Sequence, residues 1–376
     1  MIPFLSRSLA ATALAFILFT PALAAPSCSV VRIGSGSEPS GLNNAGQVVG
    51  NRYLADGSAL AEIWSQGSTS PLAPAWSGSS EAWGINDAGV AAGAVTWTAT
   101  DGSTVTRAAT FAAGAATLLA PPGTLSSWAD GINNAGQIAL SVQMADGSWR
   151  AQLYSPDSGY ADLGTLGTWA DPHGLNQNGV VVGTSAVSEA EWHAFMYANG
   201  TIQDLGTPDA SSGANAINSQ GVVVGYANPA PGDEFEHAVM FAGGQAIDLG
   251  TLGGLRSSAF DINDNGDILG WSFRADGSLG YFLYSNGAMV DLDTLLDPGT
   301  HLTGATSIND DGQILASATD GDTSFNVLLT PTGAPMASRA LAAPEPASRD
   351  TLQLAPRSGK AYPEGRRRRQ MVRQPG

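Results

Sequence analysis

Short apolar runs alternate with clusters of Gly, Asn, Asp and Ser along almost the whole chain. Runs such as His193-Ala194-Phe195-Met196-Tyr197, bounded by turn residues, predict short β-strands. Val180-Val181-Val182 is apolar at successive positions, which is typical of a strand packed on both faces. Asp-Gly pairs, as at Asp56-Gly57 and Asp276-Gly277, predict tight hairpin turns. The pattern therefore predicts an all-β protein.

One motif recurs along the chain: an aliphatic residue, Asn, two variable residues, Gly, and then a short aliphatic run. Its seven copies are spaced 42 to 47 residues apart. The Asn residues are Asn43, Asn86, Asn133, Asn176, Asn218, Asn263 and Asn309. An Asn side chain caps a tight turn, and the Gly three residues later takes the left-handed conformation that leads into the next strand. A period of this size indicates a propeller or a solenoid.

Each unit contains four predicted strands, joined mostly by hairpin turns, and this is the size of a propeller blade. The third predicted strand ends in Asp-Leu-Gly, as at Asp204-Leu205-Gly206, and we place the irregular loop that follows it between blades. The first segment, Ser29 to Gly34, resembles a third strand, whereas the seventh unit stops near Pro331. We therefore predict a β-propeller of seven four-stranded blades closed by the N-terminal strand. A six- or eight-bladed ring is the alternative.

The two ends of the chain differ from the repeats. Residues 1–24 combine Arg7, the apolar stretch Leu9 to Phe19 and Ala22-Leu23-Ala24, which predicts a cleaved secretory signal peptide. We assign residues 25–335 to the propeller and 336–376 to a disordered basic tail. We expect a secreted, periplasmic or cell-surface protein without a membrane span in its mature chain. Cys28 is the only cysteine, and the alternative for it is a lipidated N-terminus, against which Pro26 argues.

The repeats resemble the HAF repeat of bacterial extracellular proteins. The clearest matches are His193 to Tyr197 with Asp204-Leu205-Gly206, and His237 to Phe241 with Asp248-Leu249-Gly250. The resemblance implies an exported repeat protein and no defined activity. Pro344-Glu345-Pro346 and Arg366 to Arg369 resemble the ends of a PEP-type C-terminal sorting signal. The polar residues 347–365 would replace its hydrophobic helix, so we interpret the tail as a degenerate signal, with a plain disordered basic tail as the alternative.

The distribution of charge along the chain limits the classes of binding partner. Residues 25–338 hold 30 of the 33 acidic residues and six of the sixteen Lys and Arg residues. Such a surface repels nucleic acid and anionic lipid. Neutral glycans and surface proteins remain as partners, and the oligomeric state stays open.

Candidate binding residues are Trp83, Trp128 and Trp169, which we place in the loops between the third and fourth strands of consecutive units, where Trp76 also lies. Exposed indole rings on one rim would stack on sugars. The alternative is that each ring wedges between blades. Asp261, Asn263, Asn265 and Asp267 resemble the start of a calcium loop, but Ser272 stands where its Glu is required. The repeated turn is the alternative explanation, and no other cofactor is expected.

Catalytic motifs are not evident in the sequence. His193 and His237 share one repeat position, which indicates a structural role, and His173 is the histidine with a carboxylate, Asp171, beside it in sequence. Glu189 and Glu191 are interpreted as solvated loop acids. We therefore predict a non-enzymatic binding or structural module at the cell surface or in the extracellular matrix. The alternative is a glycan-acting enzyme with its active site in the central funnel, which would require carboxylates that converge there.

Overall fold

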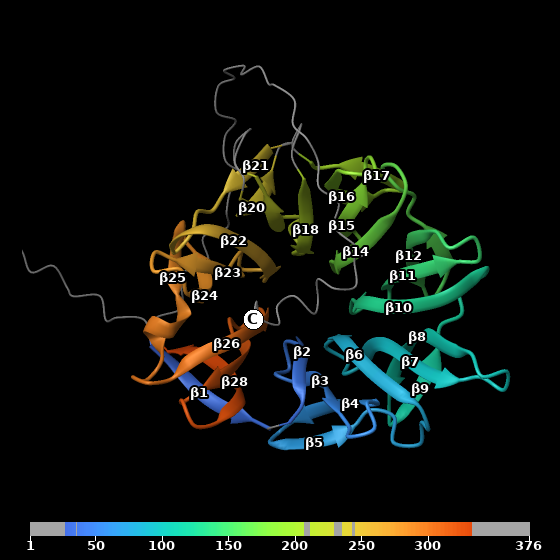
Figure 1. Cartoon of the computed structure of the whole chain (residues 1–376), viewed down its shortest axis with the longest axis horizontal. Coiled ribbons are helices and arrows are strands. Elements are labelled where there is room, and N and C mark those ends of the chain that lie inside the picture. The colour runs from blue at the N-terminus through green and yellow to red at the C-terminus, as the bar shows by residue number, and fades with distance from the viewer. Residues whose placement is uncertain (1–26, 35, 207–210, 229–234, 243–244, 333–376) are drawn as a thin grey trace, which may run out of the picture.

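The computed structural model describes residues 27–332 except 35, 207–210, 229–234 and 243–244. Seven antiparallel sheets of four strands each are arranged around a common centre, as a β-propeller (Figure 1). This confirms the predicted fold class. The predicted signal peptide and basic tail lie outside the described residues. Within the described residues, no helix has the length and apolarity needed to cross a membrane.

Each blade runs outward from an inner strand that lies nearest the centre (Figure 1). In order from the centre, blade 1 consists of β2 (Glu38–Leu42), β3 (Val48–Tyr53), β4 (Ala59–Ser65) and β5 (Ser68–Pro71), and blade 2 of β6 (Ser79–Ile85), β7 (Ala91–Thr98), β8 (Thr104–Ala112) and β9 (Ala115–Leu118). Blade 3 consists of β10 (Thr124–Ile132), β11 (Ile138–Met144), β12 (Trp149–Ser155) and β13 (Gly159–Asp162), and blade 4 of β14 (Ala170–Leu175), β15 (Val181–Ala186), β16 (Trp192–Ala198) and β17 (Thr201–Asp204). Blade 5 consists of β18 (Ser212–Ile217), β19 (Val223–Ala227), β20 (His237–Ala242) and β21 (Gln245–Asp248). Blade 6 consists of β22 (Gly253–Ile262), β23 (Ile268–Arg274), β24 (Leu279–Ser285) and β25 (Ala288–Asp291). Blade 7 consists of β26 (His301–Ile308), β27 (Ile314–Thr319), β28 (Ser324–Thr332) and β1 (Ser27–Ile33). A short 3₁₀-helix, η1 (Leu292–Leu295), joins blades 6 and 7.

The N-terminal strand closes the ring, as predicted. β1 pairs antiparallel with β28, with Val30 opposite Leu329, and so forms the outermost strand of blade 7. Ile33 at its end is buried with Val48 of blade 1 and Leu315 of blade 7. Cys28 lies inside β1 and packs, partly buried, against the core of blade 7.

The seven motif Asn side chains link all blades into one closed ring of hydrogen bonds. Asn43 Oδ1 accepts the backbone N–H groups of Ala45 and Gln47, which is the predicted turn cap. Its Nδ2 donates at 2.9 Å to the backbone carbonyl of Asn86, the equivalent residue of the next blade. The same bond repeats around the ring and closes where Asn309 Nδ2 donates to Asn43 O at 3.1 Å. All seven side chains are buried, and their amides satisfy carbonyls that would otherwise lack a partner.

Every inner strand contains a β-bulge at the same repeat position, where one extra residue interrupts the pairing. The bulged residues are Ser40, Trp83, Asp130, His173, Asn215, Phe260 and Thr306. The bulge brings the inner strand so close to its neighbour that a β carbon on Gly183 would lie 2.0 Å from Asp171 O. This close approach explains the Gly that often ends the aliphatic run.

The core lies between the blades. All six residues of β15 are buried, because the second strand of a blade packs against a neighbouring blade on each face. Val182 of blade 4 packs with Ala214 and Ile217 of blade 5, and equivalent clusters fill the other seams. The absence of a polar face on this strand is therefore a direct result of the ring geometry.

Candidate functional site

The seam between blades 3 and 4 brings together four polar side chains that are far apart in sequence. Asp130 is the bulged residue of β10, and His173 is the bulged residue of β14. Asp171 precedes His173 by two positions on β14, and Ser141 lies on β11. Both inner strands lie beside the centre of the ring (Figure 1). The cluster thus sits between neighbouring blades on the strands that face the central axis.

Two carboxylates converge on the hydroxyl of Ser141. Ser141 Oγ lies 2.6 Å from Asp130 Oδ2 and 2.5 Å from Asp171 Oδ1. The backbone N–H of Ser141 also donates to Asp130 Oδ2 at 3.0 Å. Ser141 is buried, with 8% of its surface exposed, whereas the Asp171 side chain is 30% exposed and open to solvent. The site therefore has an enclosed hydroxyl and an accessible carboxyl.

The Ser141 hydroxyl joins the two acids. A serine hydroxyl carries one hydrogen and donates it to one acceptor. Asp130 Oδ2 already accepts the Ser141 N–H, and donors of this kind favour the ionised carboxylate. Ser141 Oγ–H lies within hydrogen-bond distance of both acids and donates to either Asp130 Oδ2 or Asp171 Oδ1. The arrangement is a relay in which the Ser141 hydroxyl links the two carboxyl groups.

His173 borders this relay without entering it. Its Nδ1 lies 3.0 Å from Ala214 O of blade 5, and a carbonyl only accepts, so Nδ1 carries a proton. Its Nε2 lies 3.6 Å from Asp171 Oδ2, beyond ordinary hydrogen-bond length. Because Asp171 stands between His173 and Ser141, the imidazole is not placed to deprotonate Ser141. The cluster is therefore a carboxylate pair and not a serine nucleophile with a histidine base.

Two of the three predicted tryptophans occupy different places from those expected. Trp83 and Trp128 lie on the inner strands β6 and β10, and not in rim loops, whereas Trp169 lies in the loop between β13 and β14, as predicted. Trp83 is a bulged residue, whereas Trp128 stands two positions before its bulge and its ring lies 5.4 Å from that of Trp149. They are therefore not equivalent positions of one rim. The loop placement was wrong for Trp83 and Trp128 because the fourth strands of their units start earlier than the sequence suggests.

The structure does not bring the four predicted calcium ligands together. Asn263 Oδ1 caps its own turn by accepting from the Asn265 and Asp267 N–H groups. Asp261 instead reaches across to blade 7 and accepts hydrogen bonds from Ser307 Oγ and Ile308 N, both at 2.8 Å. Asn265 Nδ2 donates to Asp310 O. No group of three or more His, Cys, Asp or Glu side chains suited to a metal was found among the described residues.

Two predicted histidines form a repeated ion pair on the outer half of their blades. His193 Nδ1 lies 2.9 Å from Asp204 Oδ2, and His237 Nδ1 lies 3.0 Å from Asp248 Oδ2. In both cases the Asp is that of Asp-Leu-Gly on the neighbouring strand. His193 Nε2 also contacts Glu191 at 3.3 Å, so this acid is not simply solvated. These pairs join the second and third predicted strands of a unit and explain why both motifs recur together.

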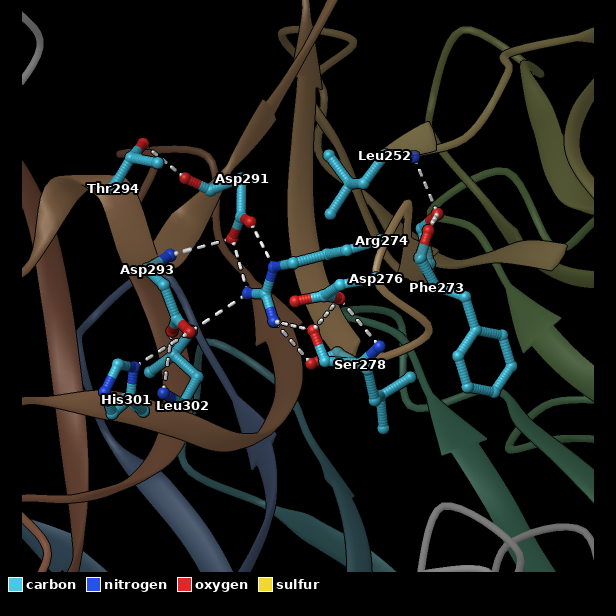
Figure 2. Close-up of polar contacts among 12 residues, drawn as sticks. Leu252, Phe273, Arg274, Asp276, Ser278, Asp291, Asp293, Thr294, His301 and Leu302 are labelled. Carbon is cyan, nitrogen blue, oxygen red and sulfur yellow. Dashed lines mark hydrogen bonds and ion pairs between the residues drawn. The ribbon is translucent and has the colours of Figure 1, made fainter. Parts of the chain in front are cut away.

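Blade 6 keeps this ion pair with a cation from another strand. Arg274, at the end of β23, contacts Asp291 with Nε at 2.5 Å and with Nη2 at 2.9 Å (Figure 2). The same Nη2 lies 3.0 Å from Asp293 of η1, whose Oδ1 accepts the N–H of Leu302 on β26. The hydrogen bonds that Arg274 donates to the Asp291 carboxylate raise the pKa of Arg274. The network links blade 6 to blade 7 and is a structural clamp.

Comparison with solved structures finds propellers that belong to enzymes. The chain superimposes on the β-propeller domain of the Trilobed protease from Pyrococcus furiosus with a TM-score of 0.52 and 9% identity, covering 79% of this chain and 96% of that one. It matches a prolyl endopeptidase with a TM-score of 0.53 and 12% identity, covering 83% of this chain and 51% of that one. A puromycin-hydrolyzing peptidase of Mycobacterium tuberculosis matches with a TM-score of 0.51 and 12% identity, covering 79% of this chain and 52% of that one. This chain thus spans about half the length of the latter two.

These likenesses define the class of protein as a seven-bladed propeller, and at such low identity they establish the fold alone. No protein-family profile and no curated protein matches the sequence. The prediction of a non-enzymatic binding or structural module is wrong: the matched propellers are parts of peptidases. The enzyme alternative required carboxylates that converge, and Asp130 and Asp171 converge in the seam between blades 3 and 4. This carboxylate pair was not predicted from the sequence because Asp130 and Asp171 belong to different repeats.

Proposed function

We propose that this protein is a hydrolase of neutral glycans in which Asp130 and Asp171 are the two catalytic carboxyl groups. The observation that carries the proposal is the convergence of both acids on Ser141 Oγ, at 2.6 and 2.5 Å. These two oxygens therefore lie at most about 5 Å apart, so the pair is no wider than the roughly 5–5.5 Å spacing of retaining glycosidases and narrower than that of inverting ones.

The relay assigns a role to each acid. Asp171, whose side chain is open to solvent, acts as the general acid on the glycosidic oxygen of the leaving group. Asp130, ionised and held by the Ser141 N–H, attacks the anomeric carbon and forms a glycosyl ester. Water, deprotonated by Asp171, then cleaves this ester, which releases the sugar and restores both acids. Ser141 is a positioning residue that holds the two carboxyl groups beside one hydroxyl.

Charge supports a neutral substrate. The propeller region carries 30 acidic residues against six Arg residues, and this field repels polyuronates, phosphorylated polymers and nucleic acid. The reaction that we propose needs no cation at the site, since both steps are proton transfers and displacements by side chains.

The proposal includes export and membership of the HAF-repeat proteins. Residues 1–24 have the pattern of a secretory signal, so the substrate would be met outside the cytoplasm. The recurrence of the His–Asp pair in blades 4 and 5 supports the resemblance, because it gives a physical reason for the two halves of the repeat.

The test is reducing-sugar release from a panel of neutral polysaccharides, with polyuronates and peptide substrates alongside. We expect hydrolysis of at least one neutral glycan, and a loss of roughly 10²-fold or more in Asp130→Asn and Asp171→Asn, in line with general acid–base contributions. Glu189→Gln, an exposed acid remote from the relay, is the matched control and keeps full activity. Circular dichroism establishes that each variant is folded.

Two outcomes overturn the proposal. One is that no neutral glycan is cleaved by the intact protein. The other is that glycan hydrolysis survives unchanged in both folded Asn variants. Cleavage of peptides alone, abolished by the same variants, would keep the carboxylate pair catalytic but replace the substrate class.

A further inference from the structure

Blade 2 contains a pocket of about 540 Å³ that lies apart from the carboxylate pair. Its walls come from the loop between β5 and β6, the start of β6, the end of β7 and the start of β8. The lining residues are Trp76, Ser77, Gly78, Ser79, Thr96, Trp97, Thr98 and Thr104. The volume falls within the roughly 300–1,000 Å³ of typical small-ligand sites.

Two indole rings form the apolar part of the pocket. Trp76 and Trp97 meet edge to face, with ring centroids 5.8 Å apart and planes inclined by 80°. Both rings are only partly buried, so each retains exposed surface. Two differently inclined aromatic faces in one pocket suit a ligand that has flat, apolar C–H faces.

The wall between these rings depends on a glycine. A β carbon on Gly78 would lie 2.1 Å from Thr96 O and 3.1 Å from Trp76 Nε1. Trp76 Nε1 is itself a buried donor without a hydrogen-bond partner in the described structure. A buried N–H without an acceptor is unfavourable, so an acceptor that reaches it would be stabilising.

The polar part of the pocket is neutral. Five of its eight lining residues are Ser or Thr, and none carries a charge. Hydroxyl groups both donate and accept hydrogen bonds, as the hydroxyls of a sugar do. A charged ligand would find no counter-ion in this lining, and an anion would also meet the acidic surface of the propeller.

We infer that the Trp76–Trp97 pocket binds a sugar unit of a neutral glycan. It holds the polymer on blade 2 while hydrolysis takes place at blades 3 and 4. The inference deepens the proposed function by naming a substrate-binding subsite, but it depends on different residues. Binding at the pocket and cleavage at Asp130 and Asp171 are therefore separable.

The test is calorimetric titration of the full chain carrying Asp130→Asn, so that turnover does not consume the ligand. The probes are the neutral hexasaccharides cellohexaose, maltohexaose and N-acetylchitohexaose, with hexagalacturonate as the charged comparison. We expect saturable binding of at least one neutral probe and none of hexagalacturonate. In this background Trp97→Ala weakens binding at least tenfold, whereas Trp149→Ala, in the aromatic pair on blade 3, leaves it unchanged.

A second variant distinguishes a loss of binding from a loss of folding. Thr104→Phe fills the pocket from an exposed position at the start of β8 and removes no buried contact. It is expected to abolish binding with an unchanged melting temperature. The proposed glycan site is wrong if neutral-glycan binding persists in both Trp97→Ala and Thr104→Phe. It is also wrong if no neutral probe binds. Binding at the pocket without any hydrolysis by the unmodified protein would instead overturn only the carboxylate proposal.

Discussion

The guanidinium of Arg274 occupies the space above Gly280, where a β carbon would lie 2.7 Å from Arg274 Cζ. Gly280 stands at the repeat position that holds His193 in blade 4 and His237 in blade 5, and that holds Arg150, which pairs with Asp162, in blade 3. In blade 6 the cation has moved to another strand while its aspartate has stayed in place (Figure 2). Blades 3 to 6 therefore keep a pair between a basic side chain and this aspartate, although the residue that supplies the basic group differs.

This relationship predicts a compensating pair of substitutions. Gly280→His alone overpacks against Arg274 and lowers the free energy of unfolding by about 1–3 kcal/mol. Arg274→Ala with Gly280→His frees that space and restores a His–Asp pair with Asp291, so the double variant should recover at least half of the loss. Urea denaturation of the wild type, the two single variants and the double variant measures the coupling. Strictly additive losses would contradict it.

The Asn ring predicts a large cost for removing one buried amide. Asn176→Ala deletes the cap of its turn and the 3.0 Å bond to Asn218 O, leaving a buried carbonyl without its donor. We expect a loss of about 2–4 kcal/mol from these combined effects. Asn178→Ala, an exposed position two residues along that bonds Ser219 O, is the control and should cost about 1 kcal/mol or less. The measurement is thermal unfolding. Equal losses of unfolding free energy in the two variants would show that the Asn ring is not a main source of stability.

Asp261 predicts a pH dependence of stability. Burial raises the pKa of its carboxyl to about 6, from a usual value of 3.8. The folded protein thus binds this proton more tightly than the unfolded chain does, so the stabilisation is complete below about pH 4 and disappears as the pH rises through 6. The difference in unfolding free energy between Asp261→Asn and the wild type should therefore shift in favour of the variant by up to about 3 kcal/mol between pH 4 and pH 8.

The measurement is a series of melting curves from pH 4 to pH 8 for the wild type and Asp261→Asn. Asp157→Asn, in an exposed hairpin of blade 3, controls for the general loss of negative charge. A difference between Asp261→Asn and the wild type that stays constant over this range would disprove the assignment.

Ser141 predicts a change in the pH profile of hydrolysis and not only in its rate. Ser141→Ala removes the hydroxyl that joins the two carboxyl groups, so the acids titrate without the relay and the pH–rate profile shifts or narrows. We expect kcat to fall about 10–100-fold, within the range for groups that position acid–base catalysts. Ser141→Thr retains the hydroxyl and should restore the profile. A lower rate with an unaltered profile in Ser141→Ala would indicate that Ser141 is only part of the packing.

The architecture was predictable because its determinants repeat. The seven Asn residues recur at the blade spacing, and each caps its own turn, which is a local interaction that sequence reveals. The second role of these residues, the bond to the next blade, is not local and was not predicted.

The candidate site was not predictable for two physical reasons. Asp130 and Asp171 are one blade apart in sequence and meet only because blades 3 and 4 pack face to face. In addition, the bulges shift the side-chain alternation of each inner strand, so Asp130 at its bulge and Asp171 two residues before its own bulge come to share one seam. Asp171-Pro172-His173 was the only local signal, and it drew attention to the histidine and not to the acid.

The pairing of β1 with β28 has a consequence for the order of assembly. Val30 and Leu329 are neighbours across the strands but stand at opposite ends of the propeller sequence. A chain that emerges from its N-terminus must hold its first strand without a partner until the last strand has appeared. Contacts of such large sequence separation form slowly, so closure of blade 7 should be the final step that turns a row of blades into a ring.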